Sequence, residues 1–330
     1  MNNGFRWGII GCGLIAPKFY NALKNTGEGS VVAAASKSIR RARRLQQKTG
    51  IPNVYGSYEE MLNRETLDAV YIANTHAEHF AAAKLCLNRG LPVLVEKAFT
   101  RNAKEAEELI TLAREKKCFM MEGMWTRFNP ASIKVRDLLD SGAIGGIEHA
   151  QIDFCVRMKR ISRKTMPWNR MYNPRLAGGA LLDVGVYCIA FARMIFGEAP
   201  AQIRTKTVKK TYTGVDATED FEFIYANGRT ASMASSFRET RPRDAVITGA
   251  GGVIRVPNFS HTDDVILIRN GAEEKFTCAA NGFEHEIREM HRCINEGLLE
   301  TPLLPLSETL ETMRIMDILR AQWNMKYPGE

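Results

Sequence analysis

The chain of 330 residues is longer than one average domain and suits two. Its content of 45% hydrophobic and 25% charged residues describes an ordinary soluble globular protein. No apolar run approaches the ~18 residues that suggest a membrane span, and the polar start of the chain shows no signal-peptide pattern. These features argue against a membrane protein, and we expect no membrane association and a cytoplasmic location.

The net charge of +8 raises the question of a nucleic-acid partner. The basic clusters are short, however, and no aromatic stacking motif accompanies them. We therefore expect a solvated basic surface and no nucleic-acid partner; the clusters are residues 40–44, Lys159-Arg160 with Arg163-Lys164, and Lys209-Lys210. The seven cysteines are scattered without any C-x-x-C, which predicts reduced thiols, no disulfide framework and no zinc site.

The first predicted element is an apolar strand at residues 5–10, followed at once by a G-x-G-x-x-A segment. The segment consists of Gly11, Cys12, Gly13, Leu14, Ile15 and Ala16. In a dinucleotide fingerprint the first glycine allows a tight turn and the second lets the backbone approach a pyrophosphate. The small third residue lets the following helix pack closely, with its N-terminus toward the anion. This position between a strand and a helix predicts a nucleotide-binding Rossmann start.

The first 125 residues alternate predicted strands and helices, which indicates a parallel sheet with right-handed crossovers. The expected strands are Arg6–Ile10, Val31–Ala35, Ala69–Ile72, Pro92–Val95 and Phe119–Glu122. The expected helices are Phe19–Lys24, Arg40–Lys48, Tyr58–Asn63, His79–Asn88 and Ala103–Lys117. Ligands of such sheets bind beyond the carboxyl ends of the strands, so the informative residues should follow strands.

The end of the second strand bears on the choice of cofactor. NAD-preferring fingerprints carry an acidic residue there to hold the ribose 2′-hydroxyl. Here the segment carries no acid, and Ser36, Lys37 and Arg40 offer a hydroxyl and two cations to a 2′-phosphate. We predict NADP rather than NAD. The alternative is that the basic residues only decorate an exposed helix.

Polar residues also follow the third predicted strand. Asn74, Thr75 and His76 are expected to border the nicotinamide ribose or the pyrophosphate. His76 and His79 are three residues apart, which could suggest a metal, but no third ligand is evident and we predict none. The segment with His285 and His291 also lacks the spacing of a zinc motif, so a polar helix face is expected there.

Glu96 and Lys97 end a buried strand at the edge where the cofactor should lie. A lysine at this place can hydrogen-bond a substrate hydroxyl or carbonyl. Burial and cofactor contacts could tune its pKa. From these residues alone, a solvated Glu–Lys pair at a strand end is an equally good interpretation.

After about residue 145 the pattern changes to β-branched, alternating runs with Gly- or Asn-rich turns, which predicts a mostly antiparallel sheet. The expected strands are Glu148–Val156, Gln202–Lys209, Asp220–Tyr225, Thr230–Phe237, Ala245–Thr248, Gly252–Val256 and Val265–Ile268. Helices at Leu181–Ile195 and Phe283–Glu296 are expected to cover this sheet, and Ser307–Asn324 is expected to be the last helix.

The segment 178–187 reads Gly-Gly-Ala-Leu-Leu-Asp-Val-Gly-Val-Tyr. Asp183 and Tyr187 are four residues apart, which places them on one face of a helix. A tyrosine beside a lysine can exchange a proton with a carbonyl–alcohol pair, because the cation favours the phenolate. A buried structural tyrosine is the alternative. We expect Lys97 and Tyr187 to meet beyond the nicotinamide and to share proton transfer.

Aromatic and basic side chains are further candidates for the substrate pocket, since they suit a polyol or an aromatic diol. Ordinary packing is the alternative for each of them. The candidates are Trp125, Arg127, Trp168, Asn169 and Arg170, and the first two could also contact the cofactor.

Four segments together carry a resemblance to a known family. They are Gly11-x-Gly13-x-x-Ala16, Glu96-Lys97, Met124-Trp125-Thr126-Arg127-Phe128, and Gly178-Gly179-Ala180-Leu181-Leu182-Asp183-x-Gly185-x-Tyr187. In this order and spacing the chain resembles the glucose–fructose oxidoreductase / inositol dehydrogenase (Gfo/Idh/MocA) family. The two later segments are most similar to its branch of dihydrodiol dehydrogenases and NADP-dependent D-xylose dehydrogenases.

The resemblance implies a fold class of α/β, with an N-terminal Rossmann doubly wound parallel sheet and a C-terminal α/β domain with a large open, mostly antiparallel sheet. It also implies catalysis by Lys97 and Tyr187, substrate orientation by Asp183, and a position near the cofactor for His79. The chain departs from the family pattern at Ala98, where the family has proline.

The resemblance and the residues together predict an oxidoreductase of two domains, 1–125 for the dinucleotide and 126–330 for substrate and dimerisation, with the last helix able to pack back on the first domain. It would transfer a hydride between NADP and a secondary alcohol or lactol carbon of a sugar or cyclic diol. A homodimer is expected through the C-terminal sheet, because a large uncovered apolar face is unusual on a monomer. The alternative, left open by Ala98, is a catalytically weak nucleotide-binding regulator or sensor.

Overall fold

The computed structural model describes residues 4–158, 161–279 and 282–330. The basic pair Lys159-Arg160 lies outside the described residues. By its internal contacts the chain divides into two compact units. We call them the Rossmann unit (Met1–Trp125 with Gly282–Leu310) and the large-sheet unit (Thr126–Asn281 with Glu311–Glu330).

The Rossmann unit is built on a six-stranded sheet in the order β3-β2-β1-β4-β5-β6, and every neighbouring pair is parallel. This is the order of a doubly wound dinucleotide-binding sheet, as predicted. The central strands are almost entirely buried, and their sequences are apolar except for Arg6 near the start of β1 and Glu96 at the end of β5. Only the three-residue β3 was not predicted. The strands are β1 (Phe5–Ile10), β2 (Gly29–Ala35), β3 (Asn53–Tyr55), β4 (Ala69–Ile72), β5 (Val93–Glu96) and β6 (Met120–Gly123).

The helices of the Rossmann unit follow the predicted alternation, with one addition. They are α1 (Ala16–Thr26), α2 (Ile39–Thr49), α3 (Tyr58–Arg64), α4 (His76–Leu87), α5 (Ala103–Glu115) and α8 (Phe283–Asn295). The prediction that α8 covers the antiparallel sheet is wrong. This helix packs against α1, and Trp7 of β1 donates a hydrogen bond to His291 at 3.0 Å. Its apolar stripe, including Ile287 and Met290, is buried, but an apolar stripe does not name its partner.

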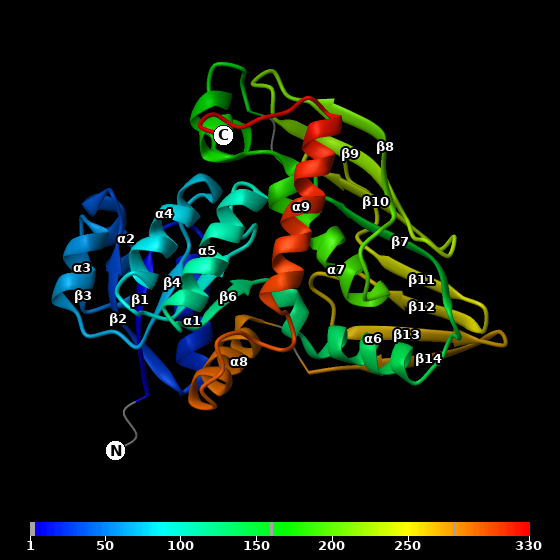
Figure 1. The fold of residues 1–330 in the computed structure, drawn as a ribbon, viewed down its shortest axis with the longest axis horizontal. Coiled ribbons are helices and arrows are strands. Elements are labelled where there is room, and N and C mark those ends of the chain that lie inside the picture. Colours follow the sequence, from blue (N-terminus) through cyan, green and yellow to red (C-terminus); the bar gives the residue numbers. More distant parts are fainter. Residues whose placement is uncertain (1–3, 159–160, 280–281) are drawn as a thin grey trace. The chain divides into compact units, whose positions relative to one another are not determined.

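The large-sheet unit contains an eight-stranded sheet in the order β14-β13-β12-β11-β7-β10-β9-β8 (Figure 1). Its pairs are antiparallel except for β7 and β10, which run parallel. The mostly antiparallel sheet was predicted, whereas the exposed edge strand β14 was not. The strands are β7 (Ile147–Cys155), β8 (Gln202–Lys210), β9 (Asp216–Ile224), β10 (Thr230–Ser236), β11 (Ala245–Gly249), β12 (Gly252–Val256), β13 (Asp264–Arg269) and β14 (Ala272–Thr277).

Helix α7 (Val186–Phe196) lies on one face of this sheet, where the ring of Tyr187 is 5.4 Å from that of Phe154 on β7. That face is apolar and buried, with Phe221 and Phe223 on β9 and Met233 on β10. Helix α6 (Pro130–Asp140), which was not predicted, contacts both α7 and β13. Helix α9 (Leu306–Gln322) begins in the Rossmann unit and continues in the large-sheet unit.

The helical stretch Pro174–Phe196 is long and apolar enough to cross a membrane by length and composition alone, with a mean hydropathy of 1.7 over its window. Asp183 and Arg193 interrupt it, so it is not one apolar run in the sequence. Of this window, 78% is buried inside the structure.

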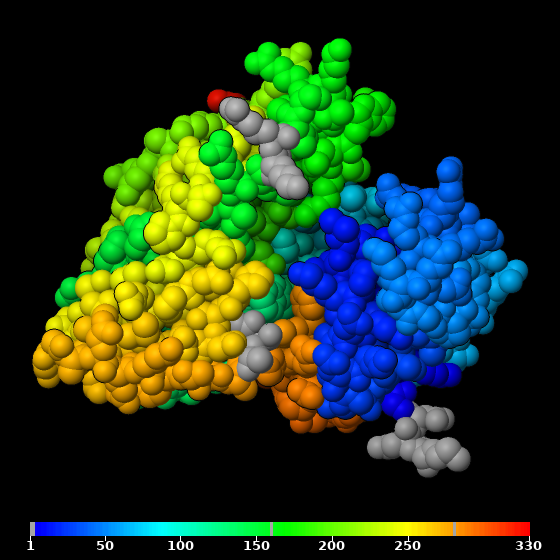
Figure 2. Space-filling model, turned by 180° about the vertical axis from the view of Figure 1, so that it is seen from behind, coloured from blue at the N-terminus to red at the C-terminus, as the bar shows by residue number. Residues whose placement is uncertain are grey.

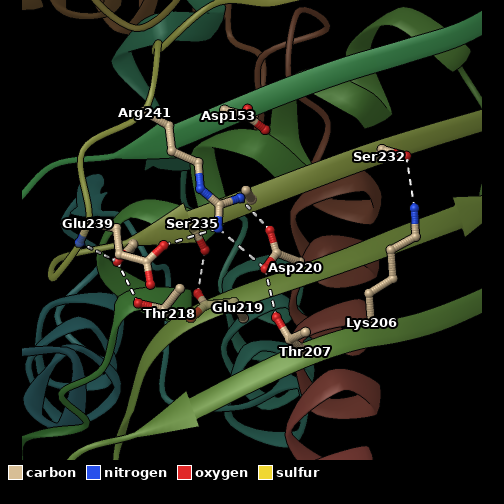
Figure 3. A network of polar contacts seen from close by, with 12 residues as sticks. Asp153, Lys206, Thr207, Thr218, Glu219, Asp220, Ser232, Ser235, Glu239 and Arg241 are labelled. Carbon is tan, nitrogen blue, oxygen red and sulfur yellow. Dashed lines mark hydrogen bonds and ion pairs between the residues drawn. The ribbon is translucent and has the colours of Figure 1, made fainter.

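The opposite face of the large sheet is polar over β7, β8, β9 and β10. It carries an ion pair between Arg241 and Asp220 (Figure 3). Further ion pairs join Lys206 to Glu222 and Lys209 to Glu239. The expectation of a large uncovered apolar face is therefore wrong for this part of the sheet. Half-buried apolar side chains occupy the same face farther along, over β11, β12 and β13: Val246, Val253 and Ile268.

Candidate active site

The loop after β1 has the geometry that the fingerprint predicts. Gly11 has a φ of 102°, and a Cβ at this position would lie 2.5 Å from backbone atoms of Ala73 and Asn74. A larger residue would therefore be strained and would collide with the loop that follows β4.

Gly13 in the same loop is different, because a Cβ there would meet only the carbonyl oxygen of Ala73, at 3.8 Å. The described protein atoms do not require a glycine at this position. A cofactor pyrophosphate close to the backbone would require one, so this open space fits the group that the fingerprint implies. Helix α1 begins nearby with no side-chain cap at Ile15, so its N-terminus and the Ala16 amide can face an anion. Cys12 lies half-buried and Leu14 is exposed in the same loop.

The end of β2 carries the residues that we predicted for the 2′-phosphate. Ser36 is buried, and its hydroxyl accepts a hydrogen bond from the Ser38 amide. Lys37 is exposed and forms an ion pair with Glu78 of α4, at 2.6 Å, which raises the pKa of the lysine. Arg40 is exposed in the first turn of α2. The pairing of Lys37 with an acid was not predicted.

The loop between β4 and α4 is organised around Glu78. The side-chain amide of Asn74 donates to the Glu78 backbone carbonyl at 3.3 Å, and the Thr75 hydroxyl donates to its carboxylate at 3.4 Å. Glu78 therefore ties this loop to Lys37 at the end of β2. Among the described residues, no group of three or more His, Cys, Asp or Glu side chains is arranged to hold a metal ion.

His79 is buried on α4 and holds the turn that follows Lys97. Its Nδ1 atom lies 3.0 Å from the carbonyl oxygen of Ala98 and 3.3 Å from that of Phe99, so the protonated nitrogen is the donor. Burial lowers the pKa of His79 to about 4, so the ring is neutral near pH 7. Its ring packs edge-on against that of His76, with centroids 5.7 Å apart. The Lys97–Ala98 peptide bond in this turn is cis.

Lys97 directly follows β5, and its neighbours are buried carboxyl groups. Glu96 accepts a hydrogen bond of 2.5 Å from the Tyr71 hydroxyl. Glu122 on β6 accepts one from Thr309 at 2.9 Å, and its burial raises the pKa to about 7, with Lys97 acting in the opposite direction. These residues, apart from Glu96, were not predicted. Their signal in the sequence is weak, because Tyr71 and Glu122 are single polar residues in apolar runs and Thr309 is one of several polar residues at the start of a helix.

Trp125 and Arg127 lie in a short 3₁₀ helix, Trp125–Phe128, and both side chains are buried. The ring of Trp125 packs against Phe283, with centroids 5.6 Å apart. Packing against Phe283 therefore accounts for much of the burial of this tryptophan. Its contact with a cofactor or substrate stays a prediction.

In the large-sheet unit, Asp183 and Tyr187 lie at the start of the helix on the buried face of the sheet. Residues Leu181–Gly185 form a π-helical turn that leads into α7. The wider turn alters the simple four-residue spacing from which we placed the two side chains on one face. Tyr187 is 9% exposed.

Asp183 forms an ion pair of 3.0 Å with Arg170, which is one of the residues predicted to line the substrate pocket. Asn169 caps the short 3₁₀ helix Arg170–Tyr172 by accepting from the Met171 amide. Trp168 is 86% exposed. Residues 161–185, which precede α7, contribute to the green projection of the large-sheet unit in Figure 2. In this structure Trp168 therefore lines no enclosed cavity.

The parallel sheet with its glycine turn, its polar strand ends and a lysine at the same edge define a dinucleotide-dependent oxidoreductase. Residues 5–124 match the model of an oxidoreductase family with an NAD-binding Rossmann fold, and residues 132–255 match the GFO/IDH/MocA C-terminal domain. The chain belongs to the GFO/IDH/MocA oxidoreductase family.

Among its relatives, trans-1,2-dihydrobenzene-1,2-diol dehydrogenase of Mus musculus is 33% identical over 98% of both chains. The structure is similar to that of KijD10, a 3-ketoreductase from Actinomadura kijaniata in complex with TDP-benzene and NADP, with a TM-score of 0.81, 26% identity and 96% coverage of both chains. The fold is also that of an aldose-aldose oxidoreductase from Caulobacter crescentus, with a TM-score of 0.86, 20% identity and 98% coverage of both chains. The chain is thus an NAD(P)-dependent oxidoreductase that transfers hydride, as predicted.

Proposed function

We propose that the protein is an NADP-dependent dehydrogenase or reductase acting on a secondary alcohol or lactol carbon of a cyclic diol or a sugar. The observation that carries this proposal is the shared carboxyl edge of the Rossmann sheet. The Gly11 loop, Asn74 and Lys97 follow β1, β4 and β5, which are neighbours in the sheet. A nicotinamide bound at this edge would lie within reach of a lysine that follows a buried strand.

The proposed chemistry is a hydride transfer coupled to a proton transfer. NADP⁺, when bound, would supply the acceptor for the hydride of the carbinol carbon. Tyr187 would take the proton from the substrate hydroxyl, Lys97 would assist by favouring the phenolate, and Asp183 would orient the substrate. In the reverse direction the Tyr187 hydroxyl would return the proton to the carbonyl oxygen. The pairing of Asp183 with Arg170 supports an orienting role, because the ion pair fixes the carboxylate.

The preference for NADP rests on Ser36, Lys37 and Arg40 and on the lack of an acid at the end of β2. The NADP in the KijD10 complex supports the same choice. Glu78 lies against Lys37, so we propose that the lysine exchanges this partner for the 2′-phosphate when the cofactor binds.

The names of the relatives suggest the class of substrate, and turnover can test it. We expect NADP⁺ to be reduced in the presence of trans-1,2-dihydrobenzene-1,2-diol or of an aldose such as D-xylose, measured by the absorbance of the reduced nicotinamide. Saturable NADP⁺ binding without turnover of any diol or sugar in the panel would instead favour the nucleotide sensor.

We further propose a cytoplasmic enzyme, with residues 1–125 for the dinucleotide and 126–330 for substrate binding and dimerisation. All seven cysteines are free in the structure, which suits a reducing compartment. The half-buried apolar side chains over β11–β13 and the ion pairs over β8–β10 would lie in the interface of a homodimer. Light scattering at micromolar concentration should give twice the chain mass of 37.0 kDa, and a monomer would contradict the dimer.

A further inference from the structure

A buried carboxylate of β9 lies directly against the start of the helix that carries Asp183 and Tyr187. Asp216 has no exposed surface, and its Oδ2 accepts a hydrogen bond of 2.6 Å from the Leu181 amide. Leu181 is the first residue of the π-helical turn, so this carboxylate satisfies a donor that the helix itself leaves open. The residue before the turn, Ala180, has no side chain that could cap it.

The same contact explains one of the glycines in the segment 178–187. Gly179 has a φ of 130°, and a Cβ there would overlap the Oδ1 atom of Asp216. The residue is therefore a glycine both because of its backbone and because the carboxylate occupies the space of a side chain.

A second glycine shows that the whole turn rests on β9 and β10. A Cβ on Gly185 would lie 2.7 Å from the Ser235 hydroxyl and 3.4 Å from Oε1 of Glu219. The Ser235 hydroxyl itself donates to Glu219 (Figure 3). Gly185 has a φ of −63°, so only space, and not backbone conformation, requires a glycine there.

The turn before Gly179 is held from another direction by the segment after α9. The Tyr327 hydroxyl donates to the carbonyl oxygen of Gly178 at 2.8 Å, and Tyr327 is buried. Its amide in turn donates to Glu330, which pairs with Arg320. The backbone from Gly178 to Leu181 is thus held by hydrogen bonds with Tyr327 and Asp216, which are distant in the sequence.

We propose that Asp216 is a positioning residue of the hydride-transfer site, which fixes the backbone of residues 180–185 and thereby the places of Asp183 and Tyr187. This rests on the proposed roles of those two residues. A displacement of about 1 Å in a catalytic group can lower a rate ~10²-fold, so a carboxylate that fixes this turn has a large effect without touching the substrate.

The test compares Asp216→Ala and Asp216→Asn with Asp220→Asn, a matched control on the same strand. Asp220 points to the opposite face, where it binds Arg241 and Thr207. Three quantities are measured: backbone hydrogen exchange of residues 180–185, the NADP⁺ dissociation constant, and kcat and KM with trans-1,2-dihydrobenzene-1,2-diol as the probe.

For Asp216→Ala we expect faster exchange at residues 180–185 and a kcat lowered about 10- to 100-fold, with NADP⁺ affinity within about twofold of the wild type. Asp216→Asn retains an oxygen that can accept from Leu181, so it should keep most of the kcat. Asp220→Asn should match the wild type. Unchanged exchange and unchanged kcat in Asp216→Ala would overturn the proposal.

If Asp216→Ala does not fold, Gly185→Ala displaces the same turn from the side of Ser235. We expect a lowered kcat, partly restored by adding Ser235→Ala, which removes the hydroxyl that the new methyl group meets. A wild-type kcat in Gly185→Ala would contradict the proposal.

A failure of the proposed function can be distinguished from a failure of the proposal for Asp216. Wild-type turnover in Tyr187→Phe would remove the role of Tyr187, whereas the exchange result for Asp216→Ala would still show whether the carboxylate fixes the turn.

Discussion

The two units of the protein position their candidate site residues in different ways. In the Rossmann unit, Gly11, Asn74 and Lys97 each follow the strand that positions them within one or two residues. In the large-sheet unit, Asp183 depends on Asp216, which comes 35 residues after the amide it binds, and Gly178 depends on Tyr327, 149 residues away. The first kind of site can be read from local patterns, and the second can be understood only from the tertiary structure.

The largest expected effect is the loss of kcat when a proposed proton-transfer group is removed from either unit. Lys97→Met and Tyr187→Phe should each lower kcat by ~10²–10⁴-fold, because both groups take part in the proposed proton transfer, with NADPH affinity nearly unchanged. Steady-state kinetics and cofactor titration measure the two quantities. The double variant should lose less than the product of the two factors, since the groups act as a unit.

Matched controls for these variants are Lys84→Met, a partly exposed lysine paired with Glu108, and Tyr212→Phe, a tyrosine that is 73% exposed. Neither should change kcat. Multiplicative losses in the double variant would mean that Lys97 and Tyr187 act independently, which would contradict their shared role.

The second prediction concerns the Rossmann unit alone. Lys37→Ala with Arg40→Ala should weaken NADPH binding about 10- to 100-fold and leave NADH binding nearly unchanged, because charge-assisted contacts to a 2′-phosphate are lost. Fluorescence titration of both cofactors measures this. Arg43→Ala with Arg44→Ala, both exposed on helix α2, is the control. Equal losses for NADPH and NADH would show that the two cations do not select the phosphate.

The parallel sheet and the site residues at its edge could be predicted from the sequence for physical reasons. Continuous apolar strands between helices specify a parallel sheet, and the Gly11 turn and the end of β5 lie beside such strands. The helix α8 was given the wrong partner because an amphipathic pattern shows a buried face and not the surface that covers it. The pairing of Lys37 with Glu78 spans 41 residues and has no local pattern.

The buried acids of the large-sheet unit were missed for a related reason. Asp216, Glu219 and Asp220 stand close together in the sequence, which resembles a solvated strand end. In the structure the first two are fully buried and the third is on the opposite face. Three acids in the first half of the strand, before its phenylalanines, were the available signal.

The smallest expected effect concerns stability and the buried acid beside Lys97. The pKa of Glu122 is raised to about 7, against about 4.3 in an unfolded chain. Its folded form binds the proton more tightly, so its contribution to stability is present below pH ~4.3 and is lost as the pH rises through 7. Glu122→Gln cannot ionise, and its amide oxygen can still accept from Thr309.

We therefore expect the Tm of Glu122→Gln to exceed that of the wild type at pH 8 by several degrees, and the difference to shrink at pH 5. Thermal unfolding at the two pH values measures this, with the exposed Glu115→Gln on α5 as control. A wild type that is the more stable protein at pH 8 would mean that Glu122 is ionised and favourably paired.

The central claim is that this chain moves a hydride from a carbinol carbon to NADP with the help of Tyr187. The most direct test is a single turnover with NADP⁺ and trans-1,2-dihydrobenzene-1,2-diol that carries deuterium on its carbinol carbons, followed by mass spectrometry of the nicotinamide product. We predict deuterium in the NADPH, formed ~10²–10⁴-fold more slowly by Tyr187→Phe. NADP⁺ that binds without gaining deuterium from this diol or from correspondingly labelled D-xylose, or equal rates in the two proteins, would contradict the account.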